Sequence, residues 1–267
     1  MHTEIERSII KKFRKKIWRR FVRGVEEFEL VSDNDKIAVC ISGGKDSMIL
    51  AKLLEELKKH GKKQFELKYI VMDPGYNKEN LDLIKKNLKM LNIDAEIFKS
   101  DIFEVIETSG GESPCYLCAR MRRGCLYNKA KQLGCNKIAL GHHFDDVIET
   151  ILLNVLYAGE YKTMMPKLKS TNFANIELIR PMYYVKEEDI IAWAKSNNLK
   201  FINCACKMTS RTENEGKRKE IKKLIKQLKQ VNENVDINIL KSSYNVNLES
   251  IVGYKQNNSK NYFLDNY

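Results

Sequence analysis

The 267-residue sequence has no apolar run long enough to cross a membrane and no secretion-signal pattern. Met1 leads into charged residues, so we expect a cytoplasmic protein without a membrane partner. Internal repeats and low-complexity linkers are also missing. A chain of this length then fits one large domain, or one domain with substantial appendages.

Paired cysteines of a secreted framework are missing as well, because the cysteine count is odd and no secretion signal precedes them. Metal or cluster binding, thiol chemistry and plain burial all stay open for these side chains. The seven cysteines are Cys40, Cys115, Cys118, Cys125, Cys135, Cys204 and Cys206.

Positive charge is abundant, with a formal net charge of +12. A basic protein tends to lie against an anion, and nucleic acid is the commonest large one. Residues 4–28 combine this charge with an apolar residue at every third or fourth position, which predicts an amphipathic helix. Its apolar stripe should dock on a core, and its basic face should meet solvent or phosphate, although a membrane-surface helix has a similar pattern.

Short apolar runs alternate with helical patterns through most of the chain. This alternation predicts an α/β fold, a parallel sheet with helices on both faces, which binds ligands at the carboxyl ends of its strands. The tail from Asn203 is less regular, with a Lys-rich helix at 217–231 and a polar, peripheral end. The predicted strands are 36–41, 66–72, 95–98, 137–140 and 176–181, and the helices are 48–59, 80–91, 118–133, 146–157 and 186–196.

The segment that follows the first predicted strand reads Ser42-Gly43-Gly44-Lys45-Asp46-Ser47. Its glycines permit a sharp turn and leave room for a ligand, and the amides at the start of the next helix point at an anion. The spacing excludes a Walker loop. The segment resembles the PP-loop of the ATP pyrophosphatases, which cleave ATP between the α and β phosphates. A glycine turn that merely caps a helix is the alternative.

A second polar segment, Gly141-His142-His143-Phe144-Asp145-Asp146, follows the fourth predicted strand. Its side chains could bind a metal, hold Mg²⁺ beside ATP, or cap a helix. With Arg180-Pro181, it resembles the tRNA 2-thiocytidine and lysidine synthetase branch of the PP-loop superfamily, over roughly residues 36–196. The resemblance implies a Rossmann-like, adenine nucleotide alpha hydrolase-like domain at 31–200, after an N-terminal helix at 1–30 and before a helical C-terminal extension at 201–267.

The C-x-x-C pair Cys115 and Cys118 and the basic run 119–124 resemble the thiolation members of this branch. In that family, C-x-x-C plus one later cysteine holds a [4Fe–4S] cluster, so the resemblance implies Cys206 or Cys204 as third ligand. We favour Cys206, because Lys217-Arg218 resembles the basic stretch that follows this ligand. Two alternatives stay open: a zinc site with four cysteine ligands, and cysteines that bind no metal. Cys40, Cys125 and Cys135 are expected to be buried.

The resemblance implies ATP-dependent tRNA thiolation. The carbonyl oxygen of a tRNA base, with a cytidine 2-carbonyl leading, is adenylated with release of pyrophosphate, and sulfur then replaces AMP. Sulfide or a persulfide carrier would donate the sulfur, and relatives suggest a homodimer. The implied catalytic residues are Lys45, Asp46, Asp146 and Arg123. The implied ATP and Mg²⁺ contacts are Ser42, Gly43, Gly44, Lys45, Asp46, Ser47, Met72, Asp73, Gly141, His142 and Asp146.

Basic residues agree with a tRNA partner. Arg120, Arg122 and Arg123 lie near the expected cluster, while the N-terminal helix and residues 217–229 could reach the RNA backbone. Three alternatives stay open: a lysidine synthetase, a PP-loop enzyme acting on a small molecule, and a nucleotide-sensing RNA-binding module without catalysis.

Overall fold

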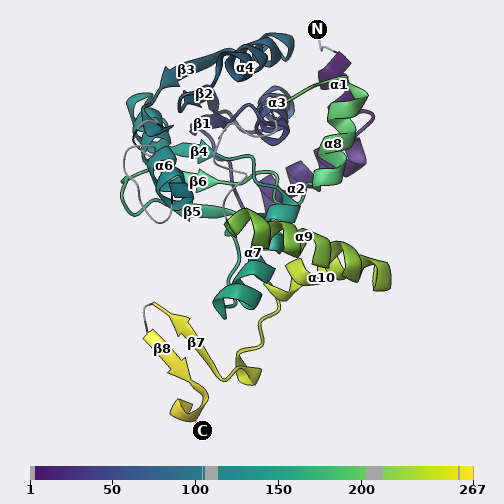
Figure 1. Ribbon diagram of the computed structural model, residues 1–267, viewed down its shortest axis with the longest axis vertical. Helices are drawn as coiled ribbons and strands as arrows, with labels where there is room; N and C mark the ends of the chain where they lie inside the picture. The colour runs from purple at the N-terminus through teal and green to yellow at the C-terminus, as the bar shows by residue number, and fades with distance from the viewer. Residues whose placement is uncertain (1–3, 104, 106–113, 203–212, 258, 267) are drawn as a thin grey trace. The chain divides into compact units, whose positions relative to one another are not determined.

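The computed structural model of the protein describes residues 4–103, 105, 114–202, 213–257 and 259–266 (Figure 1). The chain divides into two compact units. The first comprises Met1–Val147 and Met164–Gly216, and the second comprises Ile148–Thr163 and Lys217–Tyr267. The division into segments 1–30, 31–200 and 201–267 stays a prediction. None of the helices in the described ranges is long and apolar enough to cross a membrane.

A six-stranded sheet in the order β3-β2-β1-β4-β6-β5 organises the first unit. All neighbouring pairs are parallel except β5 with β6, which confirms the predicted α/β sheet and adds an antiparallel edge strand that the sequence analysis missed. The strands are β1 Lys36–Ile41, β2 Glu66–Asp73, β3 Ala95–Lys99, β4 Lys137–Ala139, β5 Lys167–Lys169 and β6 Glu177–Ile179.

The alternation of side chains along β1 explains why helices cover both faces of the sheet. Ile37, Val39 and Ile41 point into the apolar cluster that contains α3, while Ala38 and Cys40 point into the cluster that contains α6. Figure 1 shows α3 and α6 on opposite sides of the strands. The helices of this unit are α1 Glu4–Ile10, η1 Arg14–Trp18, α2 Arg19–Glu27, α3 Lys45–His60, α4 Lys78–Met90, α6 Pro114–Gln132, α7 Phe144–Leu153 (whose end enters the second unit) and α8 Glu187–Ser196.

The N-terminal segment docks as predicted, with Ile9, Phe13, Ile17, Phe21 and Val25 each at most 6% exposed. It differs from the expected continuous helix in one respect, because η1 is a π-helical turn between α1 and α2. A buried ion pair also ties the segment to the rest of the unit. Glu6 Oε1 lies 2.7 Å from the Nζ atom of Lys52 on α3.

The second unit contains the predicted Lys-rich helix as α9 Glu213–Val231, in which Ile221 and Ile225 are buried. The chain beyond residue 231, for which no helix or strand was predicted, contains a helix and an antiparallel hairpin. The helix has apolar residues at 235, 237 and 239, a spacing that is not typical of a helix, and the hairpin strands are mostly polar. The further elements are η2 Asn154–Ala158, α10 Val235–Ser242, η4 Leu248–Ser250, β7 Gly253–Gln256, β8 Ser259–Tyr262 and η5 Phe263–Asn266.

Candidate active site

The loop between β1 and α3 has the geometry of an anion-binding turn. Gly43 has a φ of +85°, and a Cβ atom there would lie 2.6 Å from Ile84 and 2.8 Å from Ile202, so only glycine fits. Gly44 caps α3 in an extended conformation. Ser47 Oγ accepts from the Ser42 amide at 3.1 Å and bonds the Gly44 carbonyl at 3.0 Å. These bonds fix the loop at the positive end of the α3 dipole.

The loop between β4 and α7 lies directly against the first turn of α3. A Cβ atom on Gly141 would come within 3.0 Å of the Asp46 carbonyl carbon and the Ser47 nitrogen. The absence of a side chain at this position therefore lets the two loops touch. They form one edge of the site because β1 and β4 are parallel neighbours in the sheet.

The paired carboxylates Asp145 and Asp146 each accept a backbone hydrogen bond at the start of a helix. Asp146 Oδ2 accepts from the amide of His143 at 3.0 Å, in the manner of a capping box on α7. Asp145 Oδ2 accepts from the amide of Glu187 at 2.7 Å and so fixes the first turn of α8. The capping role considered for this pair is therefore present.

A cavity of about 310 Å³ opens where the loops meet. Its lining includes many residues that the sequence analysis assigned to ATP, from both motifs and from the end of β2. The predicted residues in the lining are Ser42, Asp46, Ser47, Met72, Gly141, His142 and Asp146. The additional residues are Cys40, Ile41, Tyr76, Arg122, Leu126 and Leu140.

Charge at the loop is shared among Lys45, Asp46 and Glu187. Lys45 Nζ lies 2.9 Å from Glu187 Oε1 and 3.2 Å from Asp46 Oδ2. Burial lowers the pKa of Lys45, but the two carboxylates outweigh it and raise that pKa overall, so the ammonium keeps its charge at neutral pH. Glu187 carries no signal in the sequence, because it lies 142 residues from Lys45.

The second oxygen of Asp46 lacks a hydrogen-bond partner. Oδ1 is buried and accepts no hydrogen bond from the described residues, with His143 Nε2 lying 3.8 Å away. Burial raises the pKa of Asp46, although His143 and Lys45 act in the opposite direction. Among the described side chains, no group of three or more His, Cys, Asp or Glu could hold a metal ion alone. Mg²⁺ usually needs only one or two carboxylates and completes its shell with phosphates and water.

Five of the predicted ATP-site and catalytic residues lie outside the cavity lining: Gly43, Gly44 and Lys45 of the loop described above, and Asp73 and Arg123. Asp73 is buried, and its Oδ1 accepts from the amides of Gly75 at 2.9 Å and Tyr76 at 2.8 Å, so it shapes the turn after β2. Arg123 is exposed, whereas its neighbour Arg122 lines the cavity and has a buried Nε without a partner among the described residues. Asp73 and Arg123 both stay predictions as functional residues.

The helical spacing of α6 connects Cys118 to this cavity. Cys118 is four residues before Arg122 and therefore shares a helix face with it. Its side chain is half-buried and packs against a small apolar cluster that contains Met72 and Ile102. Of the other expected ligands, the side chain of Cys115 is not described, and Cys204 and Cys206 lie outside the described residues.

The three cysteines that were expected to be buried divide into two groups. Cys40 and Cys135 are buried, at 7% and 5% exposed, and burial raises the pKa of both thiols. Cys125 is only half-buried, because its position on α6 lies at the edge of the apolar cluster.

Comparisons with known proteins agree on the domain. The family model described as a PP-loop domain matches residues 9–228. The tRNA-cytidine(32) 2-sulfurtransferase of Geobacter sulfurreducens is 37% identical over 234 residues, which cover 87% of this chain and 90% of that protein. The enzyme of the same name from Syntrophotalea carbinolica is 38% identical over 216 residues, or 80% of this chain and 82% of that one.

A solved structure has the same fold. The U34-tRNA thiolase NcsA from Methanococcus maripaludis, solved with its [4Fe–4S] cluster, superposes with a TM-score of 0.69 at 22% identity. The match covers 85% of this chain and 76% of that chain.

Proposed function

Because this chain belongs to the PP-loop family, and within it to the family of its tRNA-cytidine(32) 2-sulfurtransferase relatives, we propose that it is an ATP-dependent tRNA sulfurtransferase that replaces the 2-carbonyl oxygen of a cytidine by sulfur. By the names of these relatives, the cytidine is at position 32. We call the segment Ser42–Ser47 the phosphate loop. The supporting observation is the cavity that this loop shares with the unpartnered Asp46 oxygen and with Arg122, which lies one helical turn after Cys118.

The phosphate loop would orient ATP for attack on its α-phosphorus. The amides at Gly43, Gly44 and Lys45 and the Lys45 ammonium would neutralise the phosphates, and Asp46 and Asp146 would hold Mg²⁺, which would supply further positive charge there. The carbonyl oxygen of the base forms a bond to the α-phosphorus, and pyrophosphate leaves. Hydrosulfide then attacks the C2 carbon of the base and loses its proton, and the C–O bond breaks so that the original oxygen departs with AMP.

The environment of Cys118 fits a metal-sulfur group, because this cysteine packs among apolar side chains, one of which, Met72, also lines the cavity. We propose Cys115, Cys118 and Cys206, or Cys204 in its place, as ligands of a [4Fe–4S] cluster. Three cysteine ligands would leave one iron able to bind the incoming sulfide. Arg122 has no carboxylate partner among the described residues, and its charge would favour an anionic sulfur species near the base.

Anaerobic turnover with a tRNA transcript, ATP, Mg²⁺ and sulfide tests this function. We expect 2-thiocytidine in the digested RNA by mass spectrometry, with one AMP and one pyrophosphate per sulfur, and about four irons and four sulfides per chain. Release of AMP that requires lysine and no sulfide would overturn the proposal in favour of lysidine synthesis. The Cys118→Ser variant should lose iron and thiolation, whereas the control Cys125→Ser, on the same helix, should keep both.

A further inference from the structure

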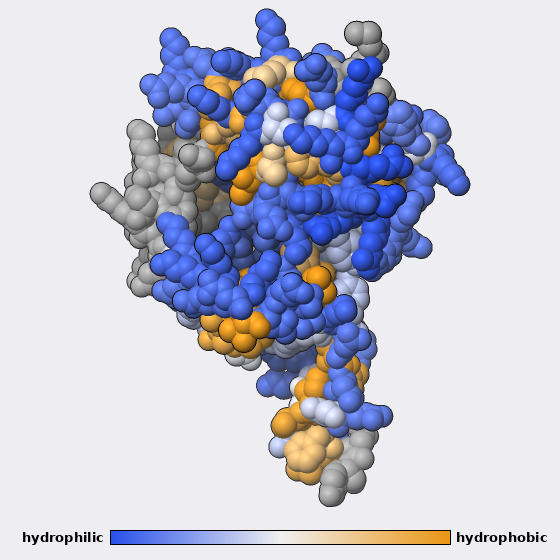
Figure 2. All heavy atoms as spheres, turned by 90° about the vertical axis from the view of Figure 1, so that its right-hand side faces the viewer, coloured by the Kyte–Doolittle hydropathy of each residue, from blue (hydrophilic) through white to orange (hydrophobic). Residues whose placement is uncertain are grey.

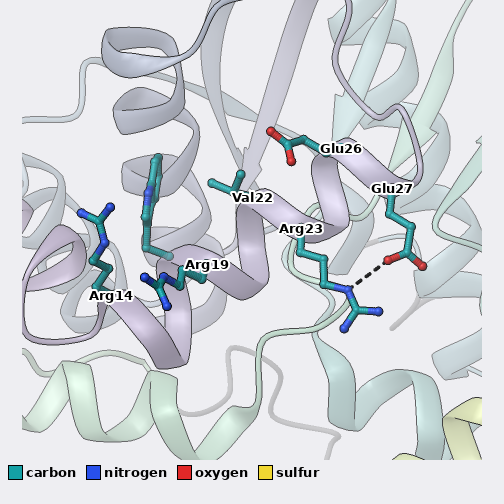
Figure 3. Close-up of a pocket in the computed structure, with 7 residues that line it drawn as sticks. Arg14, Arg19, Val22, Arg23, Glu26 and Glu27 are labelled. Carbon is teal, nitrogen blue, oxygen red and sulfur yellow. Dashed lines mark hydrogen bonds and ion pairs between the residues drawn. The ribbon is translucent and has the colours of Figure 1, made fainter.

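A second cavity lies along the N-terminal helical segment (Figure 3). It shares no lining residue with the cavity of the candidate active site. Its volume is about 420 Å³, and we call it the arginine groove. Three arginines, two apolar residues and two glutamates form it. The lining residues are Arg14, Trp18, Arg19, Val22, Arg23, Glu26 and Glu27.

The π-helical turn brings Arg14 and Arg19 to the same face. In an α-helix, residues five apart point roughly 140° away from each other. Here the amide of Arg19 donates to the carbonyl of Arg14, five residues back, and both side chains line the groove. Figure 3 shows both arginines toward one end of the segment, with Glu26 and Glu27 toward the other. Such turns are frequent at functional sites.

The cations of this segment divide into neutralised and unneutralised groups. Lys16 and Arg20 share Asp189, at 3.6 and 2.9 Å, and Arg23 Nε lies 3.0 Å from Glu27. In contrast, Arg14, Lys15 and Arg19 are exposed and form no ion pair with any carboxylate in the described ranges. No acidic residue occurs between Arg7 and Val25. The Arg14–Arg19 end of the groove therefore carries positive charge that no protein carboxylate balances.

Two anionic partners could match this charge, a membrane surface and an RNA backbone, and the direction of the apolar stripe favours the RNA. Phe13, Ile17 and Phe21 are turned into the core, so the half-buried Trp18 and Val22 are the apolar side chains of the groove, a smaller apolar face than a membrane-surface helix presents. Figure 2 looks onto the side where Figure 1 has α1 and α8, and that face is predominantly hydrophilic. Guanidinium groups present paired donors that match phosphate oxygens, and Trp18 and Val22 offer an apolar surface to a ribose.

We propose that the Arg14–Arg19 end of the arginine groove binds backbone phosphates of the RNA substrate, at a distance along the RNA from the base that reacts. The proposal rests on the proposed function for the identity of the substrate. At the other end the Arg23–Glu27 pair is neutral and Glu26 adds a negative charge that repels phosphate, so the RNA backbone crosses the groove at its N-terminal end. These contacts hold the RNA without reading its sequence.

The salt dependence of tRNA binding tests the proposal. For the double variant Arg14→Gln/Arg19→Gln, we expect roughly tenfold weaker binding at low salt, and a slope of log K against log[KCl] that is smaller by about 1.4 to 1.8, since two phosphate contacts are lost. The control Arg23→Gln removes an arginine from the same groove that Glu27 already neutralises, and it should change the slope by less than about 0.5. In turnover, the double variant should raise KM for tRNA and leave kcat within about twofold.

Three outcomes would overturn the proposal. One is an unchanged slope in the double variant, and another is an equal loss in Arg23→Gln. The third is loss of binding to phosphatidylserine vesicles with tRNA binding intact, which would assign the groove to a membrane surface. If the wild type thiolates tRNA while the double variant binds normally, only this inference fails. A wild type that does not bind tRNA would instead remove the proposed function itself.

Discussion

The phosphate loop and the arginine groove are suited to the same chemical group in different ways. The phosphate loop presents backbone amides at a helix N-terminus, and its one lysine is shared with Asp46 and Glu187. The arginine groove presents side chains, and at Arg14 and Arg19 their charge is not balanced by any described carboxylate. The first fixes a phosphate to a defined position, whereas the second supplies attraction with little directional constraint.

Substitutions at the two sites should therefore change different measured properties of the protein. The backbone geometry of the phosphate loop leaves almost no room for an added side chain, so substitutions there should lower the rate of the chemical step. Each solvated cation of the arginine groove contributes a weak attraction, and these contributions add up. Substitutions there should therefore change RNA affinity and its salt dependence.

The largest effect is expected from Gly43→Val. A side chain at φ +85°, with Ile84 and Ile202 in contact, must displace the loop, and a shift of about 1 Å should cost at least 100-fold in kcat/KM for ATP. Pyrophosphate release measures this. The control Gly216→Ala, where a Cβ meets nothing within 4 Å, should keep full activity. Normal turnover by Gly43→Val would show that the loop does not bind the phosphates.

Asp46→Asn should lower activity by about 100-fold and yet not destabilise the fold. The raised pKa of Asp46 means that its contribution to stability is present below the ordinary carboxyl pKa and is lost as pH rises through the raised value. The variant lacks this loss, so its free energy of unfolding should rise relative to that of the wild type as pH increases toward neutral.

Urea unfolding at a series of pH values from acid to neutral checks this prediction, with the exposed Asp94→Asn variant as control. A variant at position 46 that is less stable than the wild type at every pH would contradict it. Such a result would mean that the carboxylate stabilises the fold.

Glu187 should tune ATP affinity by a smaller factor. Glu187→Gln keeps an acceptor for Lys45 but removes the negative charge that competes with phosphate, so KM for ATP should fall by roughly threefold. Glu187→Ala removes the contact that orients the lysine and should lower kcat instead. The neighbour Glu188 is exposed, and Glu188→Gln should change neither constant. Identical effects of both Glu187 variants would argue against a positioning role.

The least effect on chemistry is expected from Glu6→Gln, which acts on the segment that carries the arginine groove. The buried Lys52 would keep Glu55 as a partner but lose the carboxylate of Glu6 at 2.7 Å, and the free energy of unfolding should fall by about 2 kcal/mol. Calorimetric or urea unfolding measures this loss. KM for ATP should stay within about twofold, because the ion pair does not contact the phosphate loop. A large rise in that KM would show that the N-terminal segment and the loop are coupled.

Local patterns predicted the regular parts of the molecule well. The first strand begins and ends where expected, at Lys36 and Ile41, because a short apolar run ends at glycines. Strand β5 and the hairpin β7–β8 were missed, since a few Lys, Ser and Asn residues give no periodic signal. The π turn was also invisible, because apolar residues recur at three and four positions on both sides of it.

Parts of the site could not be read from local patterns. Glu187 and Tyr76 reach the loop from other strand ends, with Tyr76 donating its hydroxyl hydrogen to the Ser42 carbonyl at 3.3 Å. Arg122 was within reach of helical spacing, since it lies four residues after Cys118. The assignments of ATP, Mg²⁺ and cluster residues stay predictions for the experiments above.

The amino-acid sequence by itself determined the α/β alternation, the two loop motifs and the direction in which the N-terminal stripe faces, because each depends on residues within a few turns of one another. Only the tertiary structure decided which charges are neutralised. Arg14 and Arg23 look equivalent in the sequence. Arg23, however, lies 3.0 Å from the carboxylate of Glu27, whereas Arg14 has no carboxylate partner among the described residues. Electrostatic energy depends on distance in space and on burial, and the fold sets both.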